Sequence, residues 1–164
     1  MDISSYTLED LILSAIKSEV ESKELYKMLS ESVKNGFMID KFKFLSNEEK
    51  KHQLYLESLY KKQFPSKKLT LPETSPVPLP RVTIPSNEDI PISSVINQAM
   101  GAEQASHDYY LQMADQFTDN EIKNMLHYFA DMELGHYRLL EQEKRSVEWF
   151  EQADVYLPMV HAGP

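Results

Sequence analysis

The chain has 164 residues, of which 41% are hydrophobic and 26% charged, and these values suit one globular domain with its own core. Its net charge of -9 at pH 7 argues against nucleic acid or an anionic membrane as a partner, because both carry negative charge themselves. Since there is no cysteine, disulfides, thiolate zinc sites, and cysteine-ligated iron–sulfur or rubredoxin-type iron centres are excluded.

The first residues, "MDISSYTLEDLI", place no basic group ahead of their apolar residues, so we expect no signal peptide. No apolar run approaches the roughly 18 residues that a membrane-spanning helix needs. The sequence therefore predicts a cytoplasmic protein that does not bind membranes.

The first half of the chain predicts two long helices. Apolar residues recur three and four positions apart over residues 7–33 and 40–63, which places them on one face of each helix. Thr7 followed by Asp10 is typical of a helix start, and Asn35-Gly36 predicts a stop with glycine in the left-handed conformation. The predicted inward positions are Leu8, Ile12, Ala15, Glu19, Ser22, Tyr26, Leu29 and Val33, then Phe42, Leu45, Glu49, His52, Leu56 and Leu59.

The second half predicts a second pair of helices after a long irregular crossing. Residues 64–91 hold seven of the nine prolines, which remove backbone donors and favour extended chain. A helix should then begin near Pro91 after the polar residues 86–89, and a short turn at 118–121 should precede the last helix. The inward positions are Ile92, Ile96, Ala99, Glu103, Ser106, Tyr110, Met113 and Phe117, then Leu126, Phe129, Glu133, His136, Leu140 and Glu143.

The two halves repeat each other at an offset of 84 residues. The identical pairs on the inward faces are Ala15/Ala99, Glu19/Glu103, Ser22/Ser106, Tyr26/Tyr110, Glu49/Glu133, His52/His136 and Leu56/Leu140. Chance has no reason to favour buried polar positions, so the pattern indicates a duplicated helical hairpin. We predict hairpins at about 5–63 and 90–146 within one four-helix domain of residues 1–146, a crossover at 64–91, and a C-terminal tail at 147–164 without a further long helix.

Four glutamates and two histidines thus lie at matching heights on inward helix faces. Isolated carboxylates in an apolar interior are costly unless paired, and no inward lysine or arginine is available to pair with all four. Two divalent cations would balance the four carboxylates, with the two imidazoles completing the ligand shell. One glutamate from each of two helices plus Glu-x-x-His from each of the other two is the arrangement of di-iron and di-manganese four-helix proteins. The predicted metal ligands are Glu19, Glu49, His52, Glu103, Glu133 and His136.

The stretches "EVESKELY" with "EEKKH", and "EQASHDYY" with "ELGH", resemble the rubrerythrin-like branch of the ferritin-like superfamily. The resemblance covers nearly the whole chain except the tail. It implies an all-α, antiparallel four-helix bundle with a long crossover between the second and third helices, and a non-haem di-iron centre. Carried over by position, Glu49 and Glu133 bridge the two irons, Glu19 and Glu103 are terminal carboxylates, and His52 and His136 each cap one metal. Manganese and zinc accept the same donors.

The chain departs from the rubrerythrin pattern in two places. Rubrerythrins usually carry a cysteine-rich rubredoxin segment, so a reducing partner of this chain would have to be a separate electron-donor molecule. They also carry another glutamate three residues after the third-helix ligand, where this chain has Ser106 followed by His107.

Four further residues are candidates for positions beside the metals: Tyr26, Tyr110, Ser106 and His107. Each tyrosine lies two turns, about 10 Å, from the glutamate of its own helix. Its role is either to donate a hydrogen bond or quench radicals near the metals, or to pack in the core with a satisfied hydroxyl. For His107 we favour a place at the bundle edge.

The leading functional interpretation is a di-iron redox protein that reacts with hydrogen peroxide or dioxygen, as a peroxidase or oxidase in oxidative stress or iron handling. No catalytic residue beyond the metal ligands is predicted. The alternatives are a non-enzymatic iron- or metal-binding protein, an oxygen-dependent hydroxylase of an organic substrate, and an interaction module, because fold alone does not choose among them. Ferritin-like relatives commonly pair, so we expect a homodimer.

Overall fold

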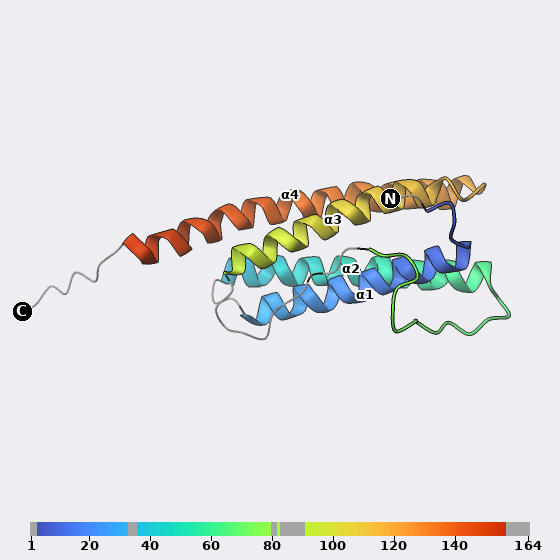
Figure 1. Ribbon diagram of the computed structural model, residues 1–164, viewed down its shortest axis with the longest axis horizontal. Helices are drawn as coiled ribbons and strands as arrows, with labels where there is room; N and C mark the ends of the chain where they lie inside the picture. Colours follow the sequence, from blue (N-terminus) through green and yellow to red (C-terminus); the bar gives the residue numbers. More distant parts are fainter. Residues whose placement is uncertain (1–2, 33–35, 80–81, 83–90, 157–164) are drawn as a thin grey trace, which may run out of the picture.

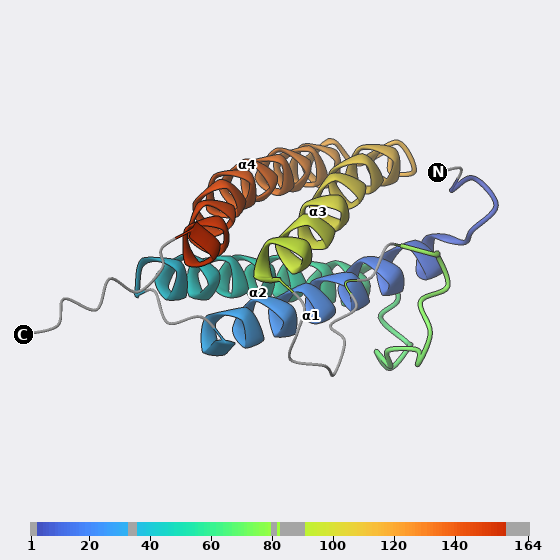
Figure 2. The ribbon, with the colours of Figure 1, turned by 60° about the vertical axis from the view of Figure 1, so that its left-hand side comes forward.

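The computed structural model describes residues 3–32, 36–79, 82 and 91–156, and within these residues the secondary structure is four α-helices. They are α1 (Leu8–Ser32), α2 (Gly36–Gln63), α3 (Ile92–Ala114) and α4 (Asn120–Tyr156). Helix α1 packs against α2 and α3 against α4, each as an antiparallel hairpin, and the two hairpins lie on each other (Figures 1 and 2). The predicted all-α four-helix bundle is confirmed.

The first helix begins where the sequence predicts it. Thr7 and Asp10 bond reciprocally: the Asp10 amide donates to Thr7 Oγ1 at 3.1 Å, and the Thr7 amide donates to Asp10 Oδ2 at 3.1 Å. These bonds satisfy backbone groups that a helix start leaves without partners. The predicted stop at Asn35-Gly36 is wrong for the glycine, which is the first residue of α2 and has no positive φ. Asn35 and Val33 lie outside the described residues.

Helix α3 follows Pro91, which occupies the N-cap position with φ -55°. Its polar lead-in, residues 86–89, lies outside the described residues. Helix α4 continues to Tyr156, past the predicted end of the bundle at residue 146. The extension has a simple cause, because the segment from 147 to 157 contains neither proline nor glycine to interrupt a helix before Pro158.

The crossing connects opposite ends of the bundle, since α2 ends at the far end from the start of α3 (Figure 1). Part of the crossing is docked on the first helix. The Val77 side chain is fully buried in the core, and its backbone amide donates to Ser14 Oγ on α1 at 3.1 Å. The crossing is therefore a packed part of the domain at this point.

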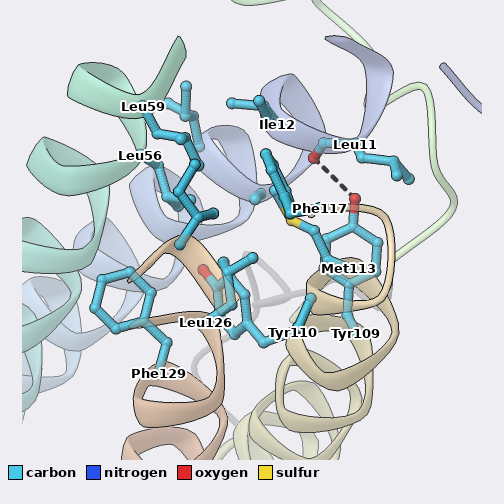
Figure 3. Packing of buried hydrophobic residues seen from close by; sticks show 14 of the residues in the cluster. Leu11, Ile12, Leu56, Leu59, Tyr109, Tyr110, Met113, Phe117, Leu126 and Phe129 are labelled. Carbon is cyan, nitrogen blue, oxygen red and sulfur yellow. Dashed lines mark hydrogen bonds between the residues drawn. The ribbon is translucent and has the colours of Figure 1, made fainter. Parts of the chain in front are cut away.

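Two apolar clusters fill the core. One contains Leu11, Ile12, Leu56, Tyr110, Leu126 and Phe129 among others (Figure 3), and the other contains Tyr26, Phe42, Leu45, Ile96 and Leu140. Along every helix the predicted ligands fall between the residues of the two clusters. The apolar layers thus flank one polar layer. No helix of the described chain is both long and apolar enough to cross a lipid bilayer.

Candidate metal centre

Every helix contributes to the polar layer at a corresponding height. Glu19 comes from α1 and Glu103 from α3, while α2 and α4 each contribute a glutamate and, one turn later, a histidine. Residues three apart share a helix face, so each Glu-x-x-His directs both side chains to the same place. All six side chains belong to residues that are at most 3% exposed: Glu19, Glu49, His52, Glu103, Glu133 and His136. These six residues are called the carboxylate–histidine cluster below.

The cluster contains two overlapping sets of potential ligand atoms, each set within 4.8 Å. One set comes from Glu19, Glu49, His52 and Glu133, and the other from Glu49, Glu103, Glu133 and His136. Glu49 and Glu133 belong to both sets. Two neighbouring cations that share two carboxylates need this arrangement.

The two histidines present the same nitrogen to the cluster. His52 Nδ1 lies 3.0 Å from Glu133 Oε1 and 3.4 Å from Glu19 Oε2. His136 Nδ1 lies 3.1 Å from Glu49 Oε1 and 3.5 Å from Glu103 Oε2. The two rings are nearly parallel, with centroids 5.8 Å apart. The duplicated sequence is thus matched by a duplicated geometry.

Several atoms of the cluster have no hydrogen-bond partner, which is a second reason why the cluster suits a metal. In the described part of the chain, all the buried side-chain nitrogen and oxygen atoms without a hydrogen-bond partner belong to the carboxylate–histidine cluster. They are Glu19 Oε2, Glu49 Oε1, His52 Nδ1, Glu133 Oε1, and both ring nitrogens of His136. The short distances between its histidines and glutamates do not have hydrogen-bond geometry. Buried polar atoms in proteins are normally bonded, so this concentration calls for a ligand. Carboxylate oxygens and imidazole nitrogens together suit iron, manganese and zinc.

The pKa values of Glu19, Glu49 and Glu133 are strongly shifted. Burial, followed by repulsion from Glu49, raises the pKa of Glu19 to about 8. Burial and the charges of Glu49 and Glu103 raise the pKa of Glu133 well above its usual range. Burial alone would also raise the pKa of Glu49, but the imidazoles of His136 and His52 outweigh it and lower that pKa. Burial therefore favours the protonated forms of Glu19 and Glu133 when no cation is bound.

The pKa values of both imidazoles in the cluster are raised. Burial opposes charge on His52, but the carboxylates of Glu133, Glu19 and Glu49 outweigh burial and raise its pKa to about 12. The pKa of His136 is raised for the same reason by Glu103, Glu133 and Glu49. Without a cation, protons occupy the nitrogen atoms that a metal would need.

The structure places Tyr26 and Tyr110 against the cluster, each in contact with the opposite hairpin. The Tyr26 hydroxyl on α1 donates to Glu103 Oε1 on α3, and the Tyr110 hydroxyl on α3 donates to Glu19 Oε1 on α1. Sequence spacing related each tyrosine to the glutamate of its own helix and missed these partners. The signal that could have found them is the equivalent position of the two tyrosines in the repeat.

Ser106 and His107 are placed differently. Ser106 is half-buried on α3, one turn after Glu103. His107 Nδ1 lies 2.8 Å from the carbonyl oxygen of Ala130, so its ring joins α3 to α4. Neither residue belongs to the two sets of potential metal ligands.

Sequence reasoning missed a buried ionic contact that connects the hairpins. Glu143 was predicted to face inward without a named partner, and it is 4% exposed. Lys41 on α2, just before the inward position Phe42, forms an ion pair with it. The long apolar stem of Lys41 lets its ammonium group reach Glu143, although Lys41 lies beside the inward face of α2 and not on it.

The fold and the cluster together define a ferritin-like four-helix protein with a buried carboxylate–histidine site. The sequence profile of the rubrerythrin family matches residues 10–144, which include all six cluster residues, and the chain belongs to this family. A solved structure of a hypothetical protein from Pyrococcus furiosus is similar, with a TM-score of 0.81 and 33% identity over 91% of this chain and 95% of that one. No curated protein matches the chain significantly.

Proposed function

We propose that the carboxylate–histidine cluster binds two iron ions and that the protein reduces hydrogen peroxide or dioxygen there. The observation that carries this proposal is the meeting of four buried carboxylates and two imidazole Nδ1 atoms in one cluster. Oxygen atoms of Glu19, Glu49 and Glu133 and both Nδ1 atoms have no hydrogen-bond partner there. Membership of the rubrerythrin family supports the proposal. Redox-inactive zinc in the same site, or iron that does not cycle, would favour the alternative of a non-enzymatic metal-binding protein.

The two sets of ligand atoms indicate how the ions are held. Glu19 and His52 would bind one ion, Glu103 and His136 the other, and Glu49 and Glu133 both. Four carboxylates balance the charge of two divalent ions, which removes the cost of buried charge. Bound there, two ferrous ions would supply the two electrons that reduce one hydrogen peroxide to two waters.

The residues around the cluster position the ligands. Tyr26 and Tyr110 each engage Oε1 of a terminal glutamate, and this leaves Oε2 of the same carboxylate turned toward a histidine of the cluster. The two tyrosines are 1% exposed, as are Glu49 and Glu133, so the flanking apolar layers keep bulk water away. Fixed carboxylates in a dry site favour a defined metal geometry.

The ligand set described here is symmetric. Ser106 stands where rubrerythrins carry an additional glutamate, and a hydroxyl cannot take the place of a carboxylate as a ligand of similar charge. The proposal therefore needs no exchange of ligands between two carboxylates on α3. The chain has no cysteine for a rubredoxin-type centre, and the proposal assigns the electrons that restore the ferrous state to a separate donor.

The test is metal analysis of protein produced with excess iron, followed by stopped-flow mixing of the ferrous form with peroxide or with oxygen. We expect two irons per chain and a faster reaction with one oxidant, which would then be identified. Glu49→Gln should abolish stoichiometric binding. Glu48→Gln is the matched control, because Glu48 is also buried, at 8% exposure, but pairs with Lys51 outside the cluster. Iron that never reacts with either oxidant would contradict the redox role.

A further inference from the structure

One phenylalanine of the core is surrounded by other rings. Phe129 packs on His52 with centroids 4.3 Å apart, and it meets Tyr110 edge-on at 5.6 Å and Tyr55 edge-on at 5.2 Å. The ring of Tyr128 lies 6.4 Å from it. Figure 3 shows Phe129 and Tyr110 within the first of the two apolar core clusters. These separations are within or near the range of ordinary aromatic pairs.

The rings extend from the candidate metal centre to the surface. Tyr110 is 1% exposed and bonds to the predicted ligand Glu19, whereas Tyr128 is 56% exposed. Phe129 lies between them and is 4% exposed. A series of three rings, Tyr110, Phe129 and Tyr128, therefore joins a buried ligand to solvent.

The repeat shows that this series belongs to one half of the bundle. At the offset of 84 residues, Tyr110 corresponds to Tyr26, but Phe129 corresponds to Leu45 and Tyr128 to Phe44. The other half thus keeps the buried tyrosine and lacks both the connecting ring and the exposed phenol. Leu45 is fully buried, so an aliphatic side chain suffices for packing at this position of the repeat.

We propose that Tyr110, Phe129 and Tyr128 form an electron path by which the exposed phenol of Tyr128 supplies electrons to the buried centre. This inference rests on the proposed function. For each hydrogen peroxide reduced to two waters, the phenol of Tyr128 acts twice in succession, and each time it gives one electron inward and one proton to balance the reaction and becomes a phenoxyl radical. An external one-electron reductant such as ascorbate then returns an electron and a proton to each phenoxyl. The path lets a donor reduce a centre that it cannot touch.

The test uses the iron-loaded protein with hydrogen peroxide, in the presence of a nitroso spin trap, and peptide mass spectrometry locates the trapped radical. We expect an adduct at Tyr128 that disappears when ascorbate is added. Phe129→Leu, which introduces the residue of the equivalent position, keeps Tyr128 but should lose its adduct. Tyr128→Phe should lose it as well. Phe44→Leu is the matched control on the other half and should retain it.

Stopped-flow absorbance of the same samples separates the two proposals. If peroxide oxidises the centre and the Tyr128 adduct is unchanged in Phe129→Leu, the electron path is overturned while the proposed function stands. If peroxide and oxygen both fail to oxidise the centre, the proposed function is overturned and the path with it. Thermal melts of each variant confirm that the chain is folded before the adduct and stopped-flow results are interpreted.

Discussion

The hydroxyl of Tyr26 on α1 donates a hydrogen bond to Oε1 of Glu103 on α3, and so connects the two hairpins beside the candidate metal centre. The repeat provides the reciprocal bond from Tyr110 to Glu19. Helices α1 and α3 are joined here by polar contacts, whereas the most extensive packing lies within each hairpin. The orientation of the terminal carboxylates therefore depends on how the two halves assemble.

The first prediction concerns this pair of tyrosines. Tyr26→Phe removes the bond that holds Glu103, and we expect it to weaken metal binding by about 10–100-fold, as loss of a partner to a metal ligand commonly does. Titration with manganese, which resists air oxidation, measures the affinity. Tyr60→Phe is the control, because Tyr60 bonds to Glu9 outside the cluster and Glu9 keeps its ion pair with Lys67. Equal loss of affinity in both variants would show that the effect is not local.

The sequence was informative about the cluster for a physical reason. Buried carboxylates are rare, so four of them on inward faces, repeated at 84 residues, predict a common partner. The structure brings Glu19, Glu49, Glu103 and Glu133 together with both histidines. Their role as metal ligands stays a prediction until metal is measured.

The partners of several side chains depend on how the helices pack, and the sequence repeat alone does not reveal this packing. The partners of Tyr26 and Tyr110 lie on the opposite hairpin, and the reach of Lys41 to Glu143 depends on the packing of α2 beside α4. Gly36 was read by its usual preference for a left-handed cap, but it begins α2 instead. Local preference is weaker than tertiary context at such positions.

The second prediction concerns the ion pair between Lys41 and Glu143. Their side chains are 27% and 6% exposed, so Lys41→Met leaves a buried carboxylate without its partner. We expect a loss of about 1–3 kcal/mol in the free energy of unfolding, measured by urea denaturation of the metal-free protein.

The repeat offers a matched compensating variant for this ion pair. The equivalent residues in the other half are Met125 and Leu59, both apolar. The double variant Lys41→Met, Glu143→Leu should therefore lie within about 1 kcal/mol of the wild type or above it. A double variant as unstable as Lys41→Met alone would contradict this account of the pair.

The third prediction is proton release when metal binds. Because the pKa of Glu19 is raised to about 8 and that of His52 to about 12, both groups hold protons at neutral pH and a cation must displace them. Protons are then products of binding, so the observed affinity rises with pH between about 6 and 8. Calorimetry with manganese in two buffers of different ionisation enthalpy measures the number released. Identical heats in the two buffers would exclude the linkage.

The fourth prediction concerns the docking of the crossing on α1. Val77 is fully buried, and Val77→Ala should lower the free energy of unfolding by about 1–3 kcal/mol through the cavity it leaves. Leu71→Ala in the same segment is the control, since Leu71 is 37% exposed and its truncation should change stability little. Urea denaturation compares the two, and similar losses at both positions would argue against a specific dock.

The most direct test of the central claim is anomalous diffraction at the iron edge from crystals of the iron-loaded protein. We expect two peaks within the carboxylate–histidine cluster, one beside Nδ1 of His52 and one beside Nδ1 of His136, both in contact with Glu49 and Glu133. Iron bound elsewhere, or a cluster without any peak in protein that retains iron, would contradict the assignment of these six residues as a dinuclear metal centre.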